Sequence, residues 1–199
     1  ATVAAAQRMG IPIFGTMAHS FVESHDDEYV AFQHFAEAHP RNTVLLLDTY
    51  DTETAAGKVV ELAARLRPAG IHIKGVRLDS GDLAQHARRV RRILDAGGLA
   101  DTTIFASGNL DETLLRDLLA QGAPIDGFGV GTHLDTSSDA PYLDCAYKLQ
   151  EYAGKARRKR SEGKATWPGR KQVYRRVDTD GRLLGDTLTL AGDVQEHLL

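Results

Sequence analysis

The sequence has almost no cysteine, no long apolar run and little net charge, and each of these shortages excludes a class of protein. Among its 199 residues Cys145 is the single cysteine, which excludes a disulfide within the chain and is typical of a reducing compartment. No apolar run is long enough to span a membrane. The formal net charge of −3 argues against general nucleic-acid binding. We therefore expect a globular cytoplasmic protein that binds neither membranes nor nucleic acids.

The beginning of the chain also lacks a basic and apolar leader with a small-residue cleavage site. The first residues start without Met and are typical of the end of a helix, which Gly10 terminates. We therefore expect that the chain begins inside a larger protein.

Apolar runs alternate with amphipathic stretches along the first 132 residues. The apolar runs predict strands and the amphipathic stretches predict helices. The expected strands are 11–15, 44–47, 71–76, 102–106 and 125–132, and the expected helices are 20–38, 52–67, 83–96 and 112–121. A repeat of about 30 residues is the size of a βα unit in a parallel sheet. This alternation indicates an α/β fold, either part of a (β/α) barrel or a doubly wound sheet.

We favour the barrel because every predicted strand ends in polar residues, whereas an open sheet usually concentrates function at one switch point. After Ala140 the composition changes, and residues 148–176 contain far more Lys and Arg than Glu. Residues 147–152 and 171–177 alternate as antiparallel strands do, and 178–181 predict a turn into a strand at 182–184. We interpret 1–140 as incomplete barrel units and 141–199 as a small β-rich appendage with a solvated or phosphate-facing basic surface.

Chemically reactive side chains gather directly after the predicted strands, and in a barrel these strand ends meet at one mouth. They are Thr16 and His19; Asp48 and Asp51; Arg77, Asp79, Ser80 and Asp82; Ser107, Gly108 and Asn109; and Gly129, Gly131 and Thr132. The last two groups are glycine-rich, which favours phosphate binding by backbone N–H groups. The carboxylates suit Mg²⁺ and ribose hydroxyls, and the guanidinium suits a carboxylate or phosphate.

Capping is the simpler alternative for some of these residues. Ser80 or Asp82 could cap the helix that begins near Leu83. Residues 109–112, Asn-Leu-Asp-Glu, predict a capping box in which Asn109 is the N-cap of the next helix.

Several motifs, in order along the chain, resemble those of the nicotinate phosphoribosyltransferases, which are type II phosphoribosyltransferases. They are Gly15-Thr-Met-Ala-His-Ser20, Gly75-Val-Arg-Leu-Asp-Ser-Gly-Asp82, Phe105-Ala-Ser-Gly-Asn-Leu-Asp-Glu112, Phe128-Gly-Val-Gly-Thr132, Tyr147-Lys-Leu149 and Lys164-Ala-Thr-Trp-Pro-Gly-Arg-Lys171. The resemblance extends from the first residues to about Arg176. Because the motifs agree in order, they are together far more specific than any one of them.

This resemblance implies a partial (β/α) barrel with a small β-rich C-terminal appendage. It also implies an enzyme of NAD biosynthesis that joins nicotinate to phosphoribosyl pyrophosphate, forming nicotinate mononucleotide and pyrophosphate. ATP hydrolysis would be coupled to this glycosyl transfer through a phosphohistidine. Mg²⁺ would be the cofactor, and the protein would be a cytoplasmic homodimer.

The resemblance assigns roles to individual residues. His19 aligns with the histidine that ATP phosphorylates, and a neutral imidazole suits that attack. Thr16 and Arg77 match positions that contact nicotinate, where the guanidinium would bind the ring carboxylate. Asp48 and Asp79 would act in catalysis and hold Mg²⁺. The residues expected to bind phosphoribosyl pyrophosphate are Ser80, Gly81, Asp82, Ser107, Gly108, Asn109, Gly129, Val130, Gly131 and Thr132.

The sequence departs from the family in lacking its N-terminal domain and first barrel strands, including an aromatic residue that stacks on nicotinate. These 199 residues are therefore not expected to close a barrel or to be fully active alone. A nicotinamide phosphoribosyltransferase and an inactive phosphate-binding member of the family remain alternatives. Quinolinate phosphoribosyltransferase fits poorly because its site uses no phosphorylated histidine. An RNA-binding module at 155–171 is a further, minor alternative.

Overall fold

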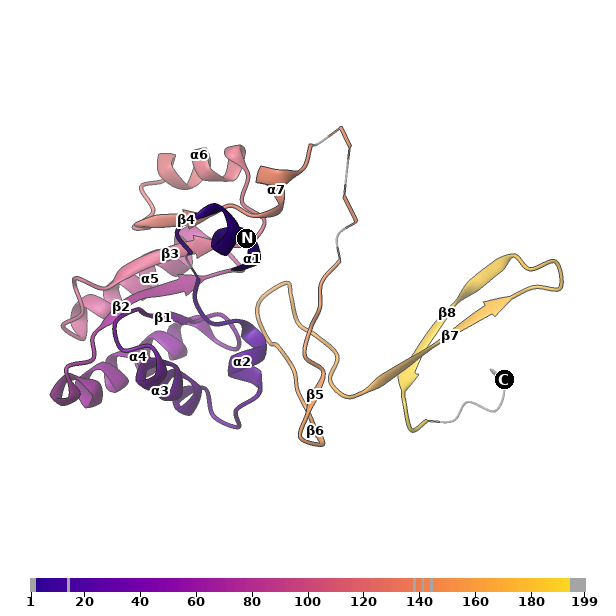
Figure 1. Ribbon diagram of the computed structural model, residues 1–199, viewed down its shortest axis with the longest axis horizontal. Coiled ribbons are helices and arrows are strands. Elements are labelled where there is room, and N and C mark those ends of the chain that lie inside the picture. The colour runs from indigo at the N-terminus through magenta and orange to yellow at the C-terminus, as the bar shows by residue number, and fades with distance from the viewer. Residues whose placement is uncertain (1–2, 14, 138, 141, 144, 194–199) are drawn as a thin grey trace.

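The computed structural model describes residues 3–13, 15–137, 139–140, 142–143 and 145–193. Figure 1 shows a layered unit of strands and helices formed by the earlier part of the chain, and two antiparallel hairpins that lie to one side of it. Within the described ranges no helix is both long and apolar enough to cross a bilayer.

Four strands form one parallel sheet, and their order in space is their order in the chain. They are β1 (Thr43–Leu46), β2 (Ile73–Leu78), β3 (Thr103–Ser107) and β4 (Gly127–Gly129). The helices between them are α4 (Thr52–Leu66), followed by the 3₁₀ turn η1 (Arg67–Ala69), α5 (Leu83–Ala96) and α6 (Glu112–Ala120). Because every pair is parallel, the carboxyl ends of all four strands lie along one edge of the sheet.

The α/β class and these βα units are therefore confirmed. The described sheet is open, with β1 and β4 at its two edges, and shows no barrel closure. This agrees with the expectation that these residues do not close a barrel by themselves. The doubly wound alternative is not favoured by the strand order, which never reverses.

The predicted strand at 11–15 is wrong for the residues that the structure describes there. Residues 11–13 and 15 form no strand, and Phe14 lies outside the described residues. Ile11 and Ile13 are 56% and 60% exposed, because no described strand pairs with this segment. The helix expected before it is confirmed as α1 (Val3–Met9), and Gly10 follows it with a left-handed φ of 67°.

The predicted helix at 20–38 is in fact two helices, α2 (His19–Glu23) and α3 (Glu28–Ala38). Asp27 starts the second helix, because its side chain accepts a hydrogen bond of 2.8 Å from the backbone N–H of Tyr29. The prediction missed this break because the apolar spacing continues across it.

The main core lies between the sheet and helices α3, α4 and α5. Its fully buried side chains include Phe32, Leu45, Leu62, Val76, Leu94 and Ile104. Burying each such side chain contributes about 1.5–3 kcal/mol. This core fixes β1 and β2 side by side and thereby determines where their polar carboxyl ends lie.

The C-terminal part forms two hairpins after a short helix, α7 (Thr132–Asp135). In the first, β5 (Glu151–Tyr152) pairs with β6 (Lys155–Ala156); in the second, β7 (Lys171–Val177) pairs with β8 (Leu183–Leu190). The predicted turn at 178–181 is confirmed, while the strand predicted at 182–184 is longer and the one at 147–152 shorter. Residues 141, 144 and 194–199 of the predicted appendage lie outside the described residues. A division at residue 140 remains a prediction.

Residues 157–164, which we call the strap, leave the first hairpin and cross the carboxyl edge of the sheet. The backbone N–H of Arg160 donates to the carbonyl of Thr49 at 2.9 Å. The hydroxyl of Ser161 donates to the carbonyl of Asp48. The strap therefore closes one side of the edge where the predicted site residues gather.

Candidate active site

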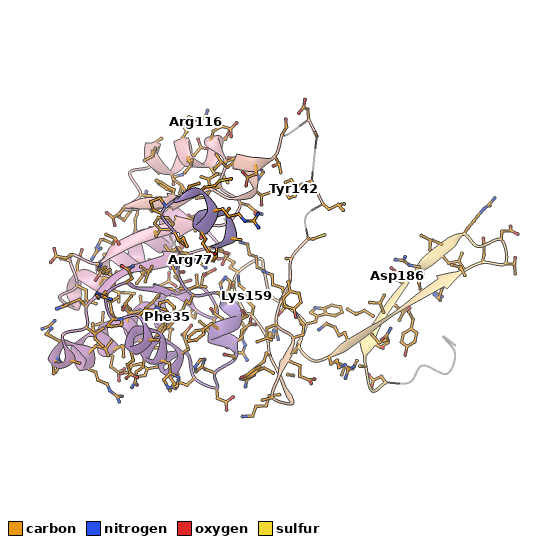
Figure 2. All side chains as sticks on the ribbon, viewed as in Figure 1. Phe35, Arg77, Arg116, Tyr142, Lys159 and Asp186 are labelled. Atoms are coloured by element: carbon orange, nitrogen blue, oxygen red, sulfur yellow. The ribbon has the colours of Figure 1, made fainter. Side chains whose placement is uncertain are left out.

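Four side chains predicted from the strand exits lie together at the carboxyl edge of the sheet. His19 is the first residue of α2, Asp48 follows β1, Asp79 follows β2 directly, and Ser107 ends β3. Figure 2 labels two residues of this region, Arg77 on β2 and Lys159 on the strap. Parallel pairing places the three strand exits next to one another, and α2 brings the histidine over them.

The imidazole of His19 has a hydrogen-bond partner on each nitrogen and is 13% exposed. Its Nδ1 lies 3.1 Å from the hydroxyl of Thr49, and its Nε2 lies 2.7 Å from the Nζ of Lys159. Carboxylate oxygens of Asp79 and Asp48 lie 3.6 and 3.9 Å from Nε2, beyond hydrogen-bond distance. The histidine is therefore oriented by Thr49 and Lys159 and faces two carboxylates.

Asp48 is only 2% exposed, and it uses its two carboxylate oxygens differently. One oxygen accepts a hydrogen bond from the hydroxyl of Ser80. The other, Oδ1, is buried and has no hydrogen-bond partner among the described residues. A buried carboxylate oxygen without a donor is destabilising, and it offers an acceptor to a bound cation or ligand.

Asp79 is held in its ionised form. Its Oδ1 accepts a hydrogen bond of 2.6 Å from the hydroxyl of Ser107, and its Oδ2 lies 3.4 Å from the Nζ of Lys164. Burial by itself raises the pKa of Asp79, but its neighbours His19, Ser107, Lys164 and Arg77 outweigh burial and hold that pKa well below its usual range. Asp79 thus carries a stable negative charge 3.6 Å from the imidazole.

Two lysines of the strap, Lys159 and Lys164, join His19, Asp48 and Asp79 in one group, which we call the histidine cluster. Neither lysine was predicted as a site residue from the sequence. Lys159 is 1% exposed, and Lys164 donates to the carbonyl of Asp79 at 2.6 Å. Burial lowers the pKa of Lys159, and the charges of Asp48 and Asp79 counteract this. The prediction of a solvated basic surface is therefore wrong for Lys159, and its phosphate-facing alternative stays a prediction.

The available sequence signal for Lys159 was weak. The strap is extended, so alternate residues face the protein: Lys159 and Ser161 are buried, whereas Arg158 and Arg160 are exposed. Alternating burial is usually recognised in a sequence because apolar and polar residues alternate. Residues 157–160 are all basic, so the sequence does not show which of them is buried.

The two residues predicted to contact nicotinate converge on one backbone carbonyl. Arg77 donates from Nη2 to the carbonyl of Met17 at 3.2 Å, and the hydroxyl of Thr16 donates to the same carbonyl at 3.1 Å. The Nε of Arg77 is buried and has no partner among the described residues. Arg77 therefore retains an unused donor beside Thr16, as a site for a carboxylate requires.

Several residues predicted to bind phosphate have structural partners within the protein. Ser80 donates to Asp48, and Asp82 is the N-cap of α5, accepting from the N–H of Gln85 at 2.9 Å. Gly81 has a φ of 75°, and an added Cβ would lie 2.7 Å from Nε2 of His86. The capping alternative thus holds for Asp82, while the helix-capping prediction for Asn109 is wrong.

Asp111, and not Asn109, caps α6 by accepting a hydrogen bond of 2.8 Å from the N–H of Leu114. Asn109 is instead exposed and adopts a left-handed φ of 52° in the loop after β3. The capping box predicted at 109–112 is wrong because the loop continues for two residues after Asn109 before α6 begins.

The two glycine-containing turns lie at the same edge of the sheet as His19. Ser107 pairs with Gly129 across β3 and β4, so the turns that follow these strands are neighbours. Gly131 precedes α7, which begins at Thr132. Among the described residues no hydrogen bond or ion pair joins Gly129, Val130, Gly131 or Thr132 to the histidine cluster. The structure thus brings these residues to one edge without direct contact.

The cluster fits a divalent cation in part. Potential ligand atoms of His19, Asp48 and Asp79 all lie within 4.8 Å of one another. The two carboxylates, one with an unpartnered oxygen, suit Mg²⁺, which prefers oxygen ligands; the imidazole nitrogen does not. Asp48 and Asp79 are therefore the residues that could hold the predicted Mg²⁺.

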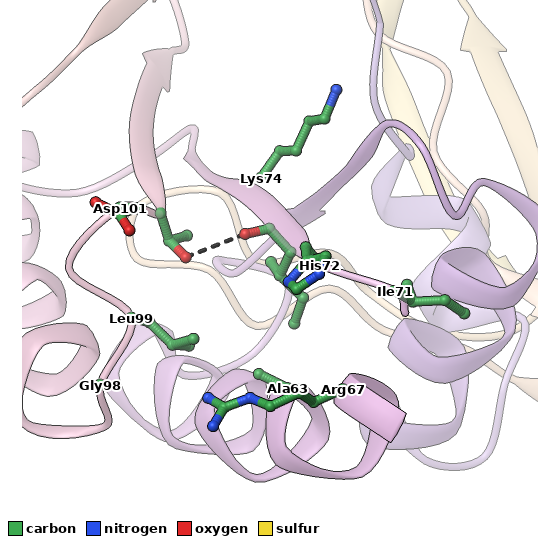
Figure 3. A pocket seen from close by; sticks show the side chains of 10 residues that line it. Ala63, Arg67, Ile71, His72, Lys74, Gly98, Leu99 and Asp101 are labelled. Atoms are coloured by element: carbon green, nitrogen blue, oxygen red, sulfur yellow. Dashed lines mark hydrogen bonds between the residues drawn. The ribbon is translucent and has the colours of Figure 1, made fainter. Parts of the chain in front are cut away.

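A cavity lies at the opposite edge of the sheet, and none of the predicted site residues lines it. It has a volume of about 430 Å³ and lies at the amino ends of β2 and β3, beside His72, Lys74, Leu99 and Asp101 (Figure 3). It contains no cluster of catalytic groups comparable with that at the carboxyl edge.

No family model matches the chain, but curated proteins of known sequence do. A protein of Mycobacterium tuberculosis named nicotinate phosphoribosyltransferase is 51% identical over 189 residues, covering 95% of this chain and 40% of that protein. A Bacillus subtilis protein of the same name is 42% identical over 182 residues, covering 88% and 37%. The chain therefore spans less than half the length of these curated relatives.

The crystal structure of a nicotinate phosphoribosyltransferase from Porphyromonas gingivalis has the same fold. It superposes with a TM-score of 0.66 over 83% of this chain and 46% of its own, at 22% identity. The ordered motifs, the parallel βα units and the identity to curated relatives agree. Across the part that its 199 residues span, the chain belongs to the nicotinate phosphoribosyltransferase family.

Proposed function

We propose that the whole protein is a nicotinate phosphoribosyltransferase of NAD biosynthesis. It transfers the phosphoribosyl group of phosphoribosyl pyrophosphate to nicotinate, releasing pyrophosphate, and couples this transfer to ATP hydrolysis through a phosphohistidine at His19. The convergence of His19, Asp48 and Asp79 at one edge carries the proposal, because these residues come from separate elements and include a nucleophile and two acids. The curated relatives of the same name support it.

The site residues fit the charges that develop in this reaction. Breaking the bond from ribose to pyrophosphate creates positive charge on the ribose ring, which the carboxylate of Asp79 would stabilise. The leaving pyrophosphate gains negative charge, which Lys159 and Lys164 would offset. Asp48 and Asp79 would hold Mg²⁺, which when bound would neutralise part of the charge on the pyrophosphate.

The choice between nicotinate and nicotinamide depends on Arg77. Its guanidinium lies beside Thr16 and has a buried Nε without a partner among the described residues. A carboxylate can pair with this cation, whereas an amide gains much less from it. We therefore favour nicotinate over nicotinamide.

We further propose a cytoplasmic homodimer that uses nicotinate, phosphoribosyl pyrophosphate and ATP. The single, exposed Cys145 supports a reducing compartment. The second hairpin supports a partner surface, because Val173, Val177 and Leu188 lie on one of its faces and are 53%, 54% and 44% exposed.

The test is formation of nicotinate mononucleotide from labelled nicotinate and phosphoribosyl pyrophosphate, with and without ATP. We expect ATP to raise the rate and to label His19 with acid-labile phosphate. His19→Ala should lose the label and the stimulation by ATP, whereas His72→Ala, on the opposite edge of the sheet, should retain both. Arg77→Ala should lose the preference for nicotinate over nicotinamide. Absence of product from the whole protein under both conditions would reject the proposal.

A further inference from the structure

Lys159 places an ammonium group in an unusual position for a lysine. The residue is 1% exposed, and its Nζ lies 2.7 Å from Nε2 of His19. Two buried cations this close would repel strongly. The contact is therefore stabilising only when one partner donates a hydrogen bond and the other accepts it.

Counting donors decides which partner accepts. A charged lysine has three N–H donors and no acceptor, so Nε2 of His19 must accept with its lone pair. The imidazole is then neutral and carries its proton on Nδ1. The hydroxyl of Thr49, 3.1 Å from Nδ1, can accept that proton in a hydrogen bond.

The carboxylates around Lys159 favour the charged form of its side chain. Oδ2 of Asp48 lies 3.9 Å from Nζ of Lys159, and ionised Asp79 lies 3.6 Å from the imidazole. Lys164 provides a second cation at Asp79. Lys159 is also the only hydrogen-bond partner of Nε2 within the described residues.

We propose that Lys159 is a positioning residue that fixes His19 in the tautomer protonated on Nδ1 and thereby makes Nε2 the nitrogen that is phosphorylated. This inference rests on the proposed function of His19. The lone pair of Nε2 attacks the γ-phosphorus of ATP, forming the N–P bond. The bond from that phosphorus to the β–γ bridging oxygen breaks, and ADP leaves with the electron pair.

No proton has to leave Nε2 in this step, because that nitrogen already carries a lone pair. The proton on Nδ1 stays in its hydrogen bond to Thr49. The ammonium of Lys159 leaves Nε2 and pairs with the oxygens of the transferred phosphoryl group. Lys159 thus orients the nucleophile before the attack and offsets negative charge after it.

The tautomer can be measured without ATP. Nitrogen-15 NMR of protein with labelled histidine should show a protonated Nδ1 and an unprotonated Nε2 for His19. Lys159→Met should move the proton wholly or partly to Nε2, and Lys159→Arg should retain the wild-type signature. The matched control is Lys74→Met, because Lys74 is exposed at the amino end of β2, bonds to Asn42 and lies at the opposite edge of the sheet. A proton on Nε2 in the wild type, or no change in Lys159→Met, would overturn the inference.

The phosphorylated nitrogen provides the second measurement. We expect the phosphoryl group on Nε2 in the wild type, identified by phosphorus-31 and nitrogen-15 NMR. Lys159→Met should slow phosphorylation by about ten- to a hundredfold, the effect of one charge-assisted hydrogen bond, and Lys159→Arg should restore most of the rate. A phosphoryl group on Nδ1 would overturn the inference and still support the proposed function. If the wild type forms no phosphohistidine, the proposed role of His19 fails, and the tautomer measurement alone decides whether Lys159 orients the ring.

Discussion

At the scale of single residues, the site depends on close packing between the loops after β2 and β3 as much as on reactive side chains. Gly108 has a φ of 100°, and a Cβ at this position would lie 2.1 Å from the carbonyl oxygen of Asp79. Lys164 donates a hydrogen bond to the same carbonyl, so a displacement of the Asp79 backbone would also disturb Lys164. The absence of a side chain at Gly108 therefore allows the β3 exit to pack against the β2 exit.

Gly108→Ala should lower the free energy of unfolding by about 3 kcal/mol, because the left-handed backbone and the clash both oppose a Cβ. The matched control is Gly122→Ala. Gly122 also has a left-handed φ, of 59°, but an added Cβ there meets no atom within 4 Å. That variant should lose about 1 kcal/mol from backbone strain alone. Urea unfolding of both variants checks the prediction, and equal losses would contradict it.

Glu23 should make stability depend on pH. It is 2% exposed, and its Oε1 has no partner among the described residues. Burial raises its pKa, and Lys159 and Lys148 lower it in part. A carboxyl with a raised pKa contributes its stability at low pH and loses it as the pH rises through the folded-state pKa.

Relative to Glu23→Gln, the wild type should therefore lose stability as the pH rises from about 4 towards 7, since the unfolded carboxyl has a pKa of about 4.3. Urea unfolding of both proteins across this range measures the difference. A difference that stays constant with pH would show that burial does not shift the pKa of Glu23.

At the scale of elements, helix starts decide where the site loops end. Asp27, Asp51, Asp82 and Asp111 each accept a hydrogen bond from a backbone N–H in the first turn of the following helix. Three of these caps follow strand exits, so they fix the lengths of the loops that carry the site residues. The break at Asp27 likewise separates the short helix of His19 from α3.

Asp111→Ala should destabilise the protein by about 1 kcal/mol, because an N–H at the start of α6 loses its acceptor. Asp111→Asn should lose much less, since asparagine also accepts at an N-cap. Thermal or urea unfolding compares the two variants. A loss of the same size in both would mean that the charge of Asp111, and not its capping hydrogen bond, provides the stability.

At the scale of the whole molecule, the strap joins distant segments into one site. The amino end of the strap and the β6 strand before it are anchored to the loop between α2 and α3, where a carboxylate oxygen of Asp26 lies 2.6 Å from Nζ of Lys155 and the other lies 2.9 Å from Nη2 of Arg157. Arg157 also donates to the carbonyl of His25 at 3.0 Å. Further along, the strap contacts the exits of β1 and β2 and brings in both lysines.

Asp26→Ala should loosen the strap, because Lys155 and Arg157 both lose their partner. The backbone N–H of Arg160, which donates to Thr49, should then exchange with solvent several-fold faster. Hydrogen exchange followed by mass spectrometry measures this, and high salt should reduce the difference between the two proteins. Asp186→Ala is the matched control, because it removes an ion pair to Arg175 within the second hairpin. Equal exchange of the Arg160 amide in wild type and Asp26→Ala would contradict the role of the anchor.

The sequence by itself determined the α/β class, the order of the βα units and most of the reactive residues. These are local properties: apolar periodicity marks strands and helices, and parallel strands necessarily place Asp48, Asp79 and Ser107 near one edge. It misjudged the strand at 11–15, the break before α3 and the cap of α6, because each depends on whether a particular hydrogen-bond partner is present.

Only the tertiary structure decided the partners of His19. Lys159 lies 140 positions from His19 in the chain, and its burial depends on the strap crossing the sheet edge. No local pattern distinguishes this lysine from its exposed basic neighbours. Burial lowers the pKa of Lys159, and carboxylates from two other elements counteract this; such compensation exists only after the chain has folded.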